Sequence, residues 1–142
     1  MNKWEKVVYE YYNTKSKRSI CCRFQDSLDA SKKAGLLSTR QSRRMVYMDA
    51  NPSDLMITDN GDTYYAEVKH TGNTKGINSS LLEEQRMFRD RILNCGGNYQ
   101  YFIYADDIGQ WYKIPGAYFQ GKGVVKWKDI GQYMVNYLPK VY

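Results

Sequence analysis

The stretch DLMITDNGDTYYAEVKH, residues 54–70, contains the strongest structural signal of the chain. Two apolar-rich runs, 54–58 and 63–70, have a strand-like composition, and Asn60-Gly61 lies between them. An Asn-Gly pair between such runs is the strongest short-range signal of a β-hairpin. The sequence therefore predicts two antiparallel strands joined by a tight turn.

This hairpin places acidic and basic side chains together on one of its two faces. With the turn at Asn60-Gly61, Asp54 lies directly opposite Glu67, with Cβ atoms roughly 5 Å apart. Lys69 follows Glu67 by two residues, so it points to the same face. The other face is apolar and is expected to pack on the core through Leu55, Ile57, Tyr64, Ala66 and Val68.

The charged face has the parts that metal-dependent phosphodiester hydrolysis requires. Two carboxylates this close repel each other unless they share a proton or a cation. Oxygen ligands of this kind suit Mg²⁺ or Mn²⁺, and a lysine beside them can orient or deprotonate a water molecule. The alternative is an ordinary charged surface on which Lys69 only pairs with Glu67.

The remaining pattern predicts an α/β (α+β mixed sheet) fold, with a central mixed β-sheet covered by helices. Further strands are expected at 45–48, 99–105, 110–114 and 124–127. Helices are expected at 2–12, at 24–37, from a capping box at Ser80 to Cys95, and at 129–138. The helix that begins at Ser80 has Leu81, Phe88 and Ile92 on one face, and residues 13–20 and 71–79 are expected to be loops.

Length and charge describe a basic protein of domain size. The chain has 142 residues, which predicts a single domain over 1–142. Its formal net charge is +6, which is typical of proteins that meet a polyanion but also fits solubility alone. Basic residues concentrate in segment 13–44, which we expect to be an insertion or arm before the catalytic core.

Composition also excludes several classes of protein. No apolar run approaches the roughly 20 residues of a membrane span, and the first residues have no apolar signal-peptide core. The single histidine, His70, excludes nucleases built on two histidines and multi-histidine zinc sites. Three cysteines form neither a disulfide framework nor a zinc pattern, so a cytoplasmic setting is expected. Cys21, Cys22 and Cys95 are predicted to be small buried apolar residues rather than nucleophiles.

Two motifs of the chain resemble those of the PD-(D/E)XK nuclease superfamily. Pro52-Ser53-Asp54 is followed, at the end of a predicted strand, by Glu67-Val68-Lys69. The resemblance continues with an amphipathic helix that contains Gln85 and then the strand 99–104. This arrangement is similar to that of Holliday junction resolvases of the archaeal and Gram-positive bacterial types. Ser53 interrupts the Pro-Asp pair of the family, and the segment before Asp54 is longer than in the compact archaeal enzymes.

The resemblance implies a restriction endonuclease-like core and a set of site residues. It implies Asp54, Glu67 and Val68 as metal-binding positions for Mg²⁺, with Mn²⁺ able to substitute, and Lys69 as a catalytic residue. Family members add an acid from the first helix, for which Glu5 is preferred and Glu10 is the alternative. Gln85 is expected either to reach the active site or to form a hydrogen bond in the core.

The predicted function is a metal-dependent DNA endonuclease, most specifically a Holliday junction resolvase that acts as a homodimer. The alternatives are a duplex-cutting endonuclease of the restriction or homing type, and a non-catalytic nucleic-acid-binding module. The aromatic residues Trp111, Tyr112, Tyr118 and Phe119 are expected to be exposed and to supply the dimer interface. Residues expected to contact DNA are Arg40, Arg43, Arg44, His70, Thr71 and Lys75.

Overall fold

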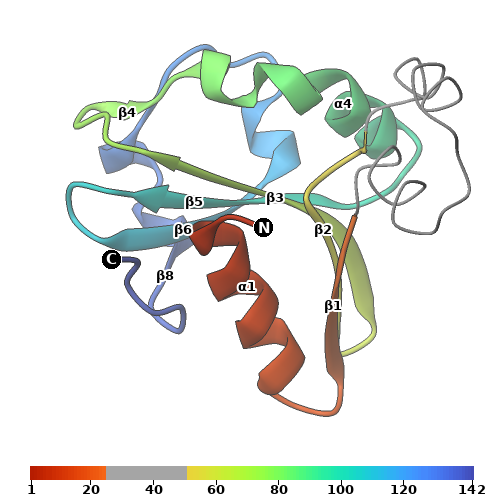
Figure 1. Cartoon of the computed structure of the whole chain (residues 1–142). Coiled ribbons are helices and arrows are strands. Elements are labelled where there is room, and N and C mark those ends of the chain that lie inside the picture. Colours follow the sequence, from red (N-terminus) through yellow and green to blue (C-terminus); the bar gives the residue numbers. More distant parts are fainter. Residues whose placement is uncertain (25–50) are drawn as a thin grey trace, which may run out of the picture.

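The computed structural model describes residues 1–24 and 51–142 (Figure 1). Helix α1 (Lys3–Thr14) is followed by strands β1 (Ser19–Arg23), β2 (Leu55–Asp59), β3 (Asp62–Thr71) and β4 (Gly76–Ile77). The 3₁₀ helix η1 (Ser79–Gln85) leads directly into α4 (Arg86–Asn94), and then come β5 (Tyr99–Ala105) and β6 (Gln110–Pro115). The C-terminal part contains η2 (Gly116–Phe119), β7 (Val125–Lys126), η3 (Trp127–Asp129), η4 (Gly131–Tyr133) and β8 (Met134–Val135).

The hairpin predicted at Asn60-Gly61 is confirmed. Strands β2 and β3 pair antiparallel, with Leu55 opposite Ala66 and Asp59 opposite Asp62. Asn60 and Gly61 have φ angles of 50° and 88°, the left-handed conformation that a type I′ hairpin turn requires at both central positions. Local turn chemistry therefore sets the register of the two strands that lead into the candidate site.

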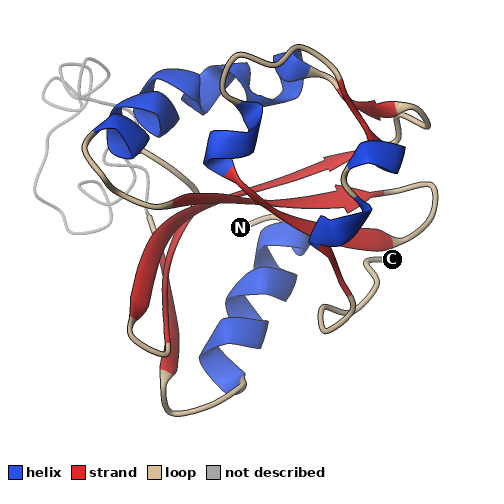
Figure 2. Cartoon of the chain, turned by 180° about the vertical axis from the view of Figure 1, so that it is seen from behind, coloured by secondary structure: helices blue, strands red, loops and turns tan. Residues whose placement is uncertain are grey.

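Six strands form a mixed sheet in the order β1-β2-β3-β5-β6-β8 (Figures 1 and 2). Strands β3 and β5 are parallel, because η1 and α4 form a crossover between them, and the other neighbouring pairs are antiparallel. Strands β4 and β7 form a separate two-stranded sheet. The predicted fold class, a mixed sheet flanked by helices, is thus confirmed.

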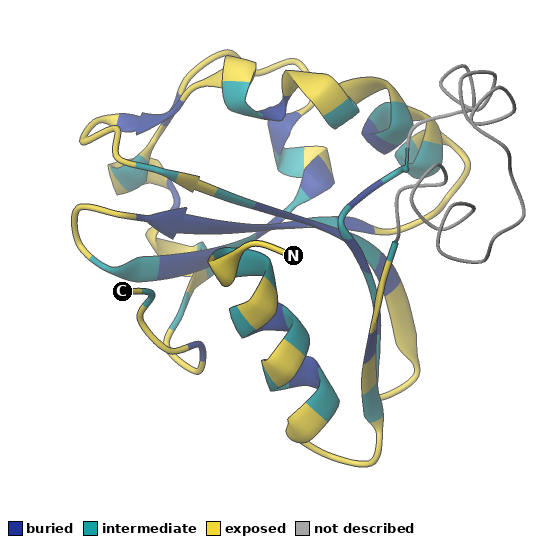
Figure 3. Cartoon of the chain, in the orientation of Figure 1, coloured by how far each residue is buried: buried dark blue, intermediate teal, exposed yellow. Residues whose placement is uncertain are grey.

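Helices cover both faces of the six-stranded sheet (Figure 3). Helix α1 packs Val8 and Tyr12 onto one face, against the apolar side of the β2–β3 hairpin. On the other face Leu82 of η1 packs against side chains of β5 and β6. Strand β5 contacts both layers and is buried along nearly its whole length, which explains its continuous apolar sequence YQYFIYA.

Helix α1 confirms the prediction for residues 2–12 and extends it to Thr14. Asn2 caps its N-terminus, where the Oδ1 atom of Asn2 accepts a hydrogen bond from the Glu5 amide at 2.8 Å. None of the helices in residues 1–24 and 51–142 is long and apolar enough to cross a membrane.

The helix predicted from Ser80 differs from the structure in its first half. The capping residue is Asn78, whose side chain accepts from the Ser80 amide at 3.2 Å, and the first seven residues form 3₁₀ helix. A 3₁₀ helix has 3.0 residues per turn rather than 3.6, which shifts the inward-facing positions. Leu82 and Arg89 are therefore the buried residues, while the predicted stripe of Leu81, Phe88 and Ile92 is only partly buried.

The predicted C-terminal helix at 129–138 is wrong, and strand β1 was not predicted. Val135 pairs with Trp111 at the edge of the sheet, and its carbonyl oxygen accepts from Gln110 Nε2 at 2.9 Å. These tertiary hydrogen bonds replace the ones that a local helix would supply. The loop predicted at 13–20 covers the first two residues of β1, and residues 21–23 were assigned to no element; with only Cys21 of its five residues buried, β1 has no clear apolar alternation. The predicted strand 124–127 is confirmed in part as β7.

Two expectations about individual side chains are also wrong. Trp111, Tyr112 and Phe119 are buried in the core, with 1%, 3% and 5% exposure, so they do not form an exposed interface. Among the cysteines Cys21 is buried, but Cys22 and Cys95 are exposed. The predicted strand at 45–48 and all but the first residue of the predicted helix at 24–37 lie outside the described residues, as do Arg40, Arg43 and Arg44.

Candidate active site

Asp54 and Glu67 lie side by side where the β2–β3 hairpin opens. Asp54 immediately precedes β2, and its Oδ2 atom accepts a hydrogen bond from the Val68 amide at 2.9 Å. This bond ties the carboxylate to the backbone of β3, one residue beyond Glu67. The hairpin register places Asp54 opposite Glu67, close enough for each carboxyl group to influence the ionisation of the other.

Glu67 is almost fully buried, with 2% exposure, and this burial dominates its electrostatics. Burial raises the pKa of Glu67 well above its usual range, and the hydrogen bond and negative charge of Asp54 raise it further. The positive charge of Lys69 lowers the pKa of Glu67 and so offsets part of this increase. Without a cation, this pair of carboxyl groups therefore holds a proton near neutral pH.

Tyr99 connects this acidic pair to the loop before β2. Its hydroxyl lies 2.7 Å from the Pro52 carbonyl oxygen and 3.4 Å from Oε2 of Glu67. Because Tyr99 is fully buried on the neighbouring strand β5, it holds the Pro52 loop and Glu67 in one fixed arrangement. The sequence did not identify Tyr99 as a site residue, because in the sequence Tyr99 is only one of several apolar residues of a predicted buried strand.

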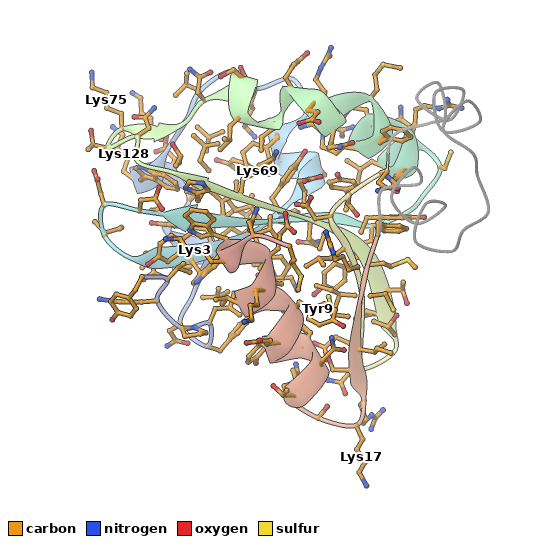
Figure 4. All side chains as sticks on the ribbon, viewed as in Figure 1. Lys3, Tyr9, Lys17, Lys69, Lys75 and Lys128 are labelled. Carbon is orange, nitrogen blue, oxygen red and sulfur yellow. The ribbon has the colours of Figure 1, made fainter. Side chains whose placement is uncertain are left out.

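Lys69 lies on the same face of β3 as Glu67, as strand alternation predicts, and Figure 4 labels it on this strand. It is half-buried and forms no salt bridge with the carboxylates of the described ranges 1–24 and 51–142. Its ammonium group is therefore available to a ligand beside the two carboxylates.

A cavity of about 280 Å³ brings Asp54 of the acidic pair together with residues of α1 and η1. Glu5 of α1 faces it, and burial, followed by the charge of Asp54, raises the pKa of Glu5. Glu10 instead lies on the surface, 3.8 Å from Lys6 and 59% exposed. The residues that line the cavity are Glu5, Arg23, Phe24, Asn51, Ser53, Asp54, Glu84 and Gln85.

Gln85 reaches this cavity rather than a hydrogen-bonding partner in the core. Its Oε1 atom is buried and accepts no hydrogen bond from the part of the chain that the structure describes. Burying an amide oxygen without a partner costs roughly 1–3 kcal/mol. A bound water molecule or cation in the cavity would supply the missing partner.

The donor atoms around the cavity fit a magnesium ion. Within residues 1–24 and 51–142 no three His, Cys, Asp or Glu side chains come together as a complete metal cage. Mg²⁺ does not require one, because it usually binds one or two carboxylates and completes its octahedral shell with water and substrate phosphate. Asp54 and Glu67 supply the carboxylates, and the Gln85 oxygen is a further hard donor.

The residues expected to contact DNA are distributed differently. His70 is in part a packing residue, because its ring stacks on Trp4 at 3.5 Å and its Nδ1 atom lies 2.9 Å from Oδ2 of Asp106. Thr71 accepts from the Asn73 amide at 3.2 Å, and Lys75 is exposed at the tip of the following loop. These residues lead away from the cavity along the end of β3.

The sequence also missed Arg23 and Glu84 as cavity residues. Arg23 ends β1, a strand whose pattern was too weak to place it near Asp54. Glu84 faces the cavity because η1 is a 3₁₀ helix, which has fewer residues per turn than an α-helix. No local sequence pattern predicted a 3₁₀ helix at this position. Arg23 and Glu84 add one positive and one negative charge to the lining of the cavity.

Comparison with known proteins identifies the fold. No protein-family profile matches the chain, and no curated protein matches it. A solved structure of Archaeoglobus fulgidus Hjc, a Holliday junction resolvase from an archaeal hyperthermophile, is similar with a TM-score of 0.51. The similarity covers 93% of this chain and 92% of that one, at 9% sequence identity. The chain therefore has the restriction endonuclease-like fold that its resemblance to PD-(D/E)XK nucleases predicted.

Proposed function

We propose that this protein is a metal-dependent DNA endonuclease, with a four-way junction as its preferred substrate. One observation carries the proposal: Glu5, Asp54 and Gln85 line one cavity, Glu67 lies beside Asp54, and Lys69 lies on the same strand face as Glu67. These residues come from three separate segments of the chain. A binding module has no need to gather acidic groups where it would meet phosphate, since they repel it.

In this proposal Asp54, Glu67 and the main-chain carbonyl of Val68 would hold Mg²⁺, which would supply positive charge at the scissile phosphate. Val68 contributes only its backbone, because its side chain is buried against α1. Lys69 orients the attacking water and stabilises negative charge that develops on the phosphate oxygens. Glu5 and Gln85, which also line the cavity, would hold further water molecules. The water oxygen forms a bond to phosphorus and gives up a proton to solvent, while the leaving oxygen keeps the electron pair of the bond that breaks and takes up a proton.

The substrate and assembly belong to the same proposal. Hjc is a Holliday junction resolvase, and a restriction endonuclease-like core with a basic charge suits such DNA. Resolution of a four-way junction requires two symmetric cuts, so we propose a two-fold homodimer with one site in each chain. The three cysteines are free, as a reducing cytoplasmic setting would leave them.

The test compares a labelled four-way junction with a linear duplex of matched sequence, with Mg²⁺ and with EDTA. We expect Mg²⁺-dependent cleavage, with the junction cut in preference to the duplex. Asp54→Asn and Lys69→Ala should each reduce cleavage at least about 100-fold while DNA affinity stays within about threefold. Glu10→Gln, an exposed glutamate on α1, is the matched control and should cleave as the wild type does.

Two other results would each favour one of the alternative functions. Equal cleavage of junction and duplex would favour a duplex-cutting endonuclease on the same core. Tight DNA binding without cleavage in Mg²⁺ or Mn²⁺ would contradict the proposal and favour a non-catalytic binding module.

A further inference from the structure

Three lysines surround a second hollow, away from the candidate active site. Lys75 lies in the loop after β3, and Lys126 and Lys128 lie on β7 and η3. All three are exposed, and Figure 4 labels Lys75 and Lys128 at the same end of the molecule. With Thr74, Val124 and Trp127 they line a hollow of about 500 Å³. We call this group, Lys75, Lys126 and Lys128, the lysine tip.

The positive charge of the lysine tip is not neutralised within the molecule. The ion pairs among residues 1–24 and 51–142 involve other cations: Lys6, Lys15, His70, Arg86 and Arg89. Three neighbouring ammonium groups without such partners repel one another, and a polyanion relieves that repulsion. The feature is therefore a candidate anion-binding surface rather than a structural salt-bridge network.

The fold holds these lysines in a fixed arrangement. Strands β4 and β7 pair with Gly76 opposite Lys126, and a Cβ atom at Gly76 would collide with the carbonyl oxygen of Val125. Trp127 donates from Nε1 to the Asn73 carbonyl at 2.7 Å and from its amide to the Lys75 carbonyl at 3.3 Å. Its ring stacks on Tyr112. Because the backbone is already ordered, binding requires little further loss of conformational entropy.

The surface of the hollow favours a sugar–phosphate backbone over a uniformly charged ligand. Its lining is largely apolar and includes Trp127 and the exposed Val124. The lysines of the tip belong to the same lining. Deoxyribose offers an apolar surface between successive phosphates, so a lining that combines apolar and positively charged side chains matches nucleic acid.

Strand β3 fixes where this contact lies relative to the cavity. Glu67 and Thr71 are on the same strand, and four residues of strand span roughly 13 Å. A duplex rises about 3.4 Å per base pair, so for a duplex arm lying along β3 this distance corresponds to about four base pairs. Lys75 follows Thr71 in the chain, and Lys75 and Lys128 lie at the end of the molecule toward which β3 runs (Figures 1 and 4).

We propose that the lysine tip binds the backbone of a duplex arm at least about four base pairs from the cleavage position. This inference rests on the proposed nuclease function for its substrate, and it adds a second contact that the active site does not provide. It makes arm length a determinant of affinity.

The test measures equilibrium binding of a four-way junction in EDTA, so that cleavage does not interfere. Lys126→Ala/Lys128→Ala should lower affinity at least about tenfold near 100 mM salt and flatten the log–log salt dependence by about two units. The control, Lys17→Ala/Lys140→Ala, removes the same charge from exposed positions, with Lys17 at the opposite end of the molecule (Figure 4). On arms trimmed to about three base pairs, wild type and Lys126→Ala/Lys128→Ala should bind alike.

Equal affinities and salt slopes for the two double variants would overturn the inference. A loss of binding to polyglutamate but not to DNA would also overturn it and assign the lysine tip to an acidic protein. Because the readout is binding without metal, it is independent of catalysis. If the wild type never cleaves DNA but the lysine tip still binds it, the proposed nuclease function fails and this inference stands.

Discussion

Two glutamates of α1 test the candidate site at the scale of single residues. Glu5 faces the cavity beside Asp54, and Glu10 is an exposed partner of Lys6. Glu5→Gln should lower cleavage by about 10- to 100-fold, the usual effect of removing a group that positions metal-bound water. Glu10→Gln should change it by less than twofold. Cleavage rates in Mg²⁺ and melting temperatures of both variants check this prediction, and equal, mild losses would contradict it.

The burial of Glu67 makes the stability of the metal-free protein depend on pH. Its pKa is raised on folding by burial and by Asp54, so the folded state disfavours the ionised form. Its contribution is fully present below the unfolded value near 4.5 and is lost as pH rises toward the folded pKa. In EDTA, Glu67→Gln should therefore melt at least about 3 °C above the wild type at pH 8.

This advantage of Glu67→Gln should shrink toward zero at pH 4.5, where Glu67 is protonated in the folded state. Glu10→Gln, with an exposed side chain, should melt as the wild type does at both pH values. Thermal melts monitored by circular dichroism measure these differences. An advantage of the same size at both pH values would show that ionisation of Glu67 is not its cause.

At the scale of elements, Arg89 attaches α4 to the sheet. Its side chain is 4% exposed, its Nε atom donates to Asp90 Oδ1 at 2.9 Å, and its Nη1 atom lies 3.5 Å from the Tyr101 hydroxyl. Arg89→Ala should lower the free energy of unfolding by about 3 kcal/mol, since it leaves buried polar groups without partners. Arg86→Ala breaks an exposed pair with Glu83 and should cost less than about 1 kcal/mol. Urea denaturation measures both, and similar losses would contradict this role for Arg89.

The elements differ in how far local sequence determines them. The β2–β3 hairpin follows from Asn60-Gly61 and strand alternation, both of which act within a few residues. Within the segment 129–138, Val135 instead pairs with Trp111 and accepts a hydrogen bond from Gln110, both on β6 and more than 20 residues away. A local sequence pattern cannot reveal such distant partners, and the helix predicted there does not form.

At the scale of the whole molecule, the proposed function predicts a stable dimer. The described residues of each chain, 1–24 and 51–142, present the acidic pair Asp54 and Glu67 once, and junction resolution needs two cuts. We expect light scattering to give about 33 kDa, twice the mass of the 16.7 kDa chain, and cleavage of a junction to give paired nicks. Because Trp111, Tyr112 and Phe119 are buried, the interface must use other residues. A monomer at micromolar concentration that nicks only one strand would contradict the dimer.

The sequence alone determined the pairing of Asp54 with Glu67, the face that Lys69 shares with them and the mixed sheet around them. Each depends on short-range rules: turn chemistry, alternation along a strand and the order of helices and strands. The restriction endonuclease-like fold was implied by the resemblance of the motifs around Asp54 and Glu67 to those of PD-(D/E)XK nucleases, and the similarity to a solved structure supports it.

Only the tertiary structure decided which distant residues complete the cavity. Glu5 was distinguished from Glu10 by the docking of α1 on the sheet, and Arg23 and Glu84 were brought to Asp54 by a weak edge strand and a 3₁₀ helix. Burial gave Tyr99 its role beside Glu67 and placed Arg89 of α4 against Tyr101 of the sheet. Contacts between segments far apart in sequence depend on how whole helices and strands pack. The packing energy is the sum of small contributions from many side chains, so no local sequence pattern predicts these contacts.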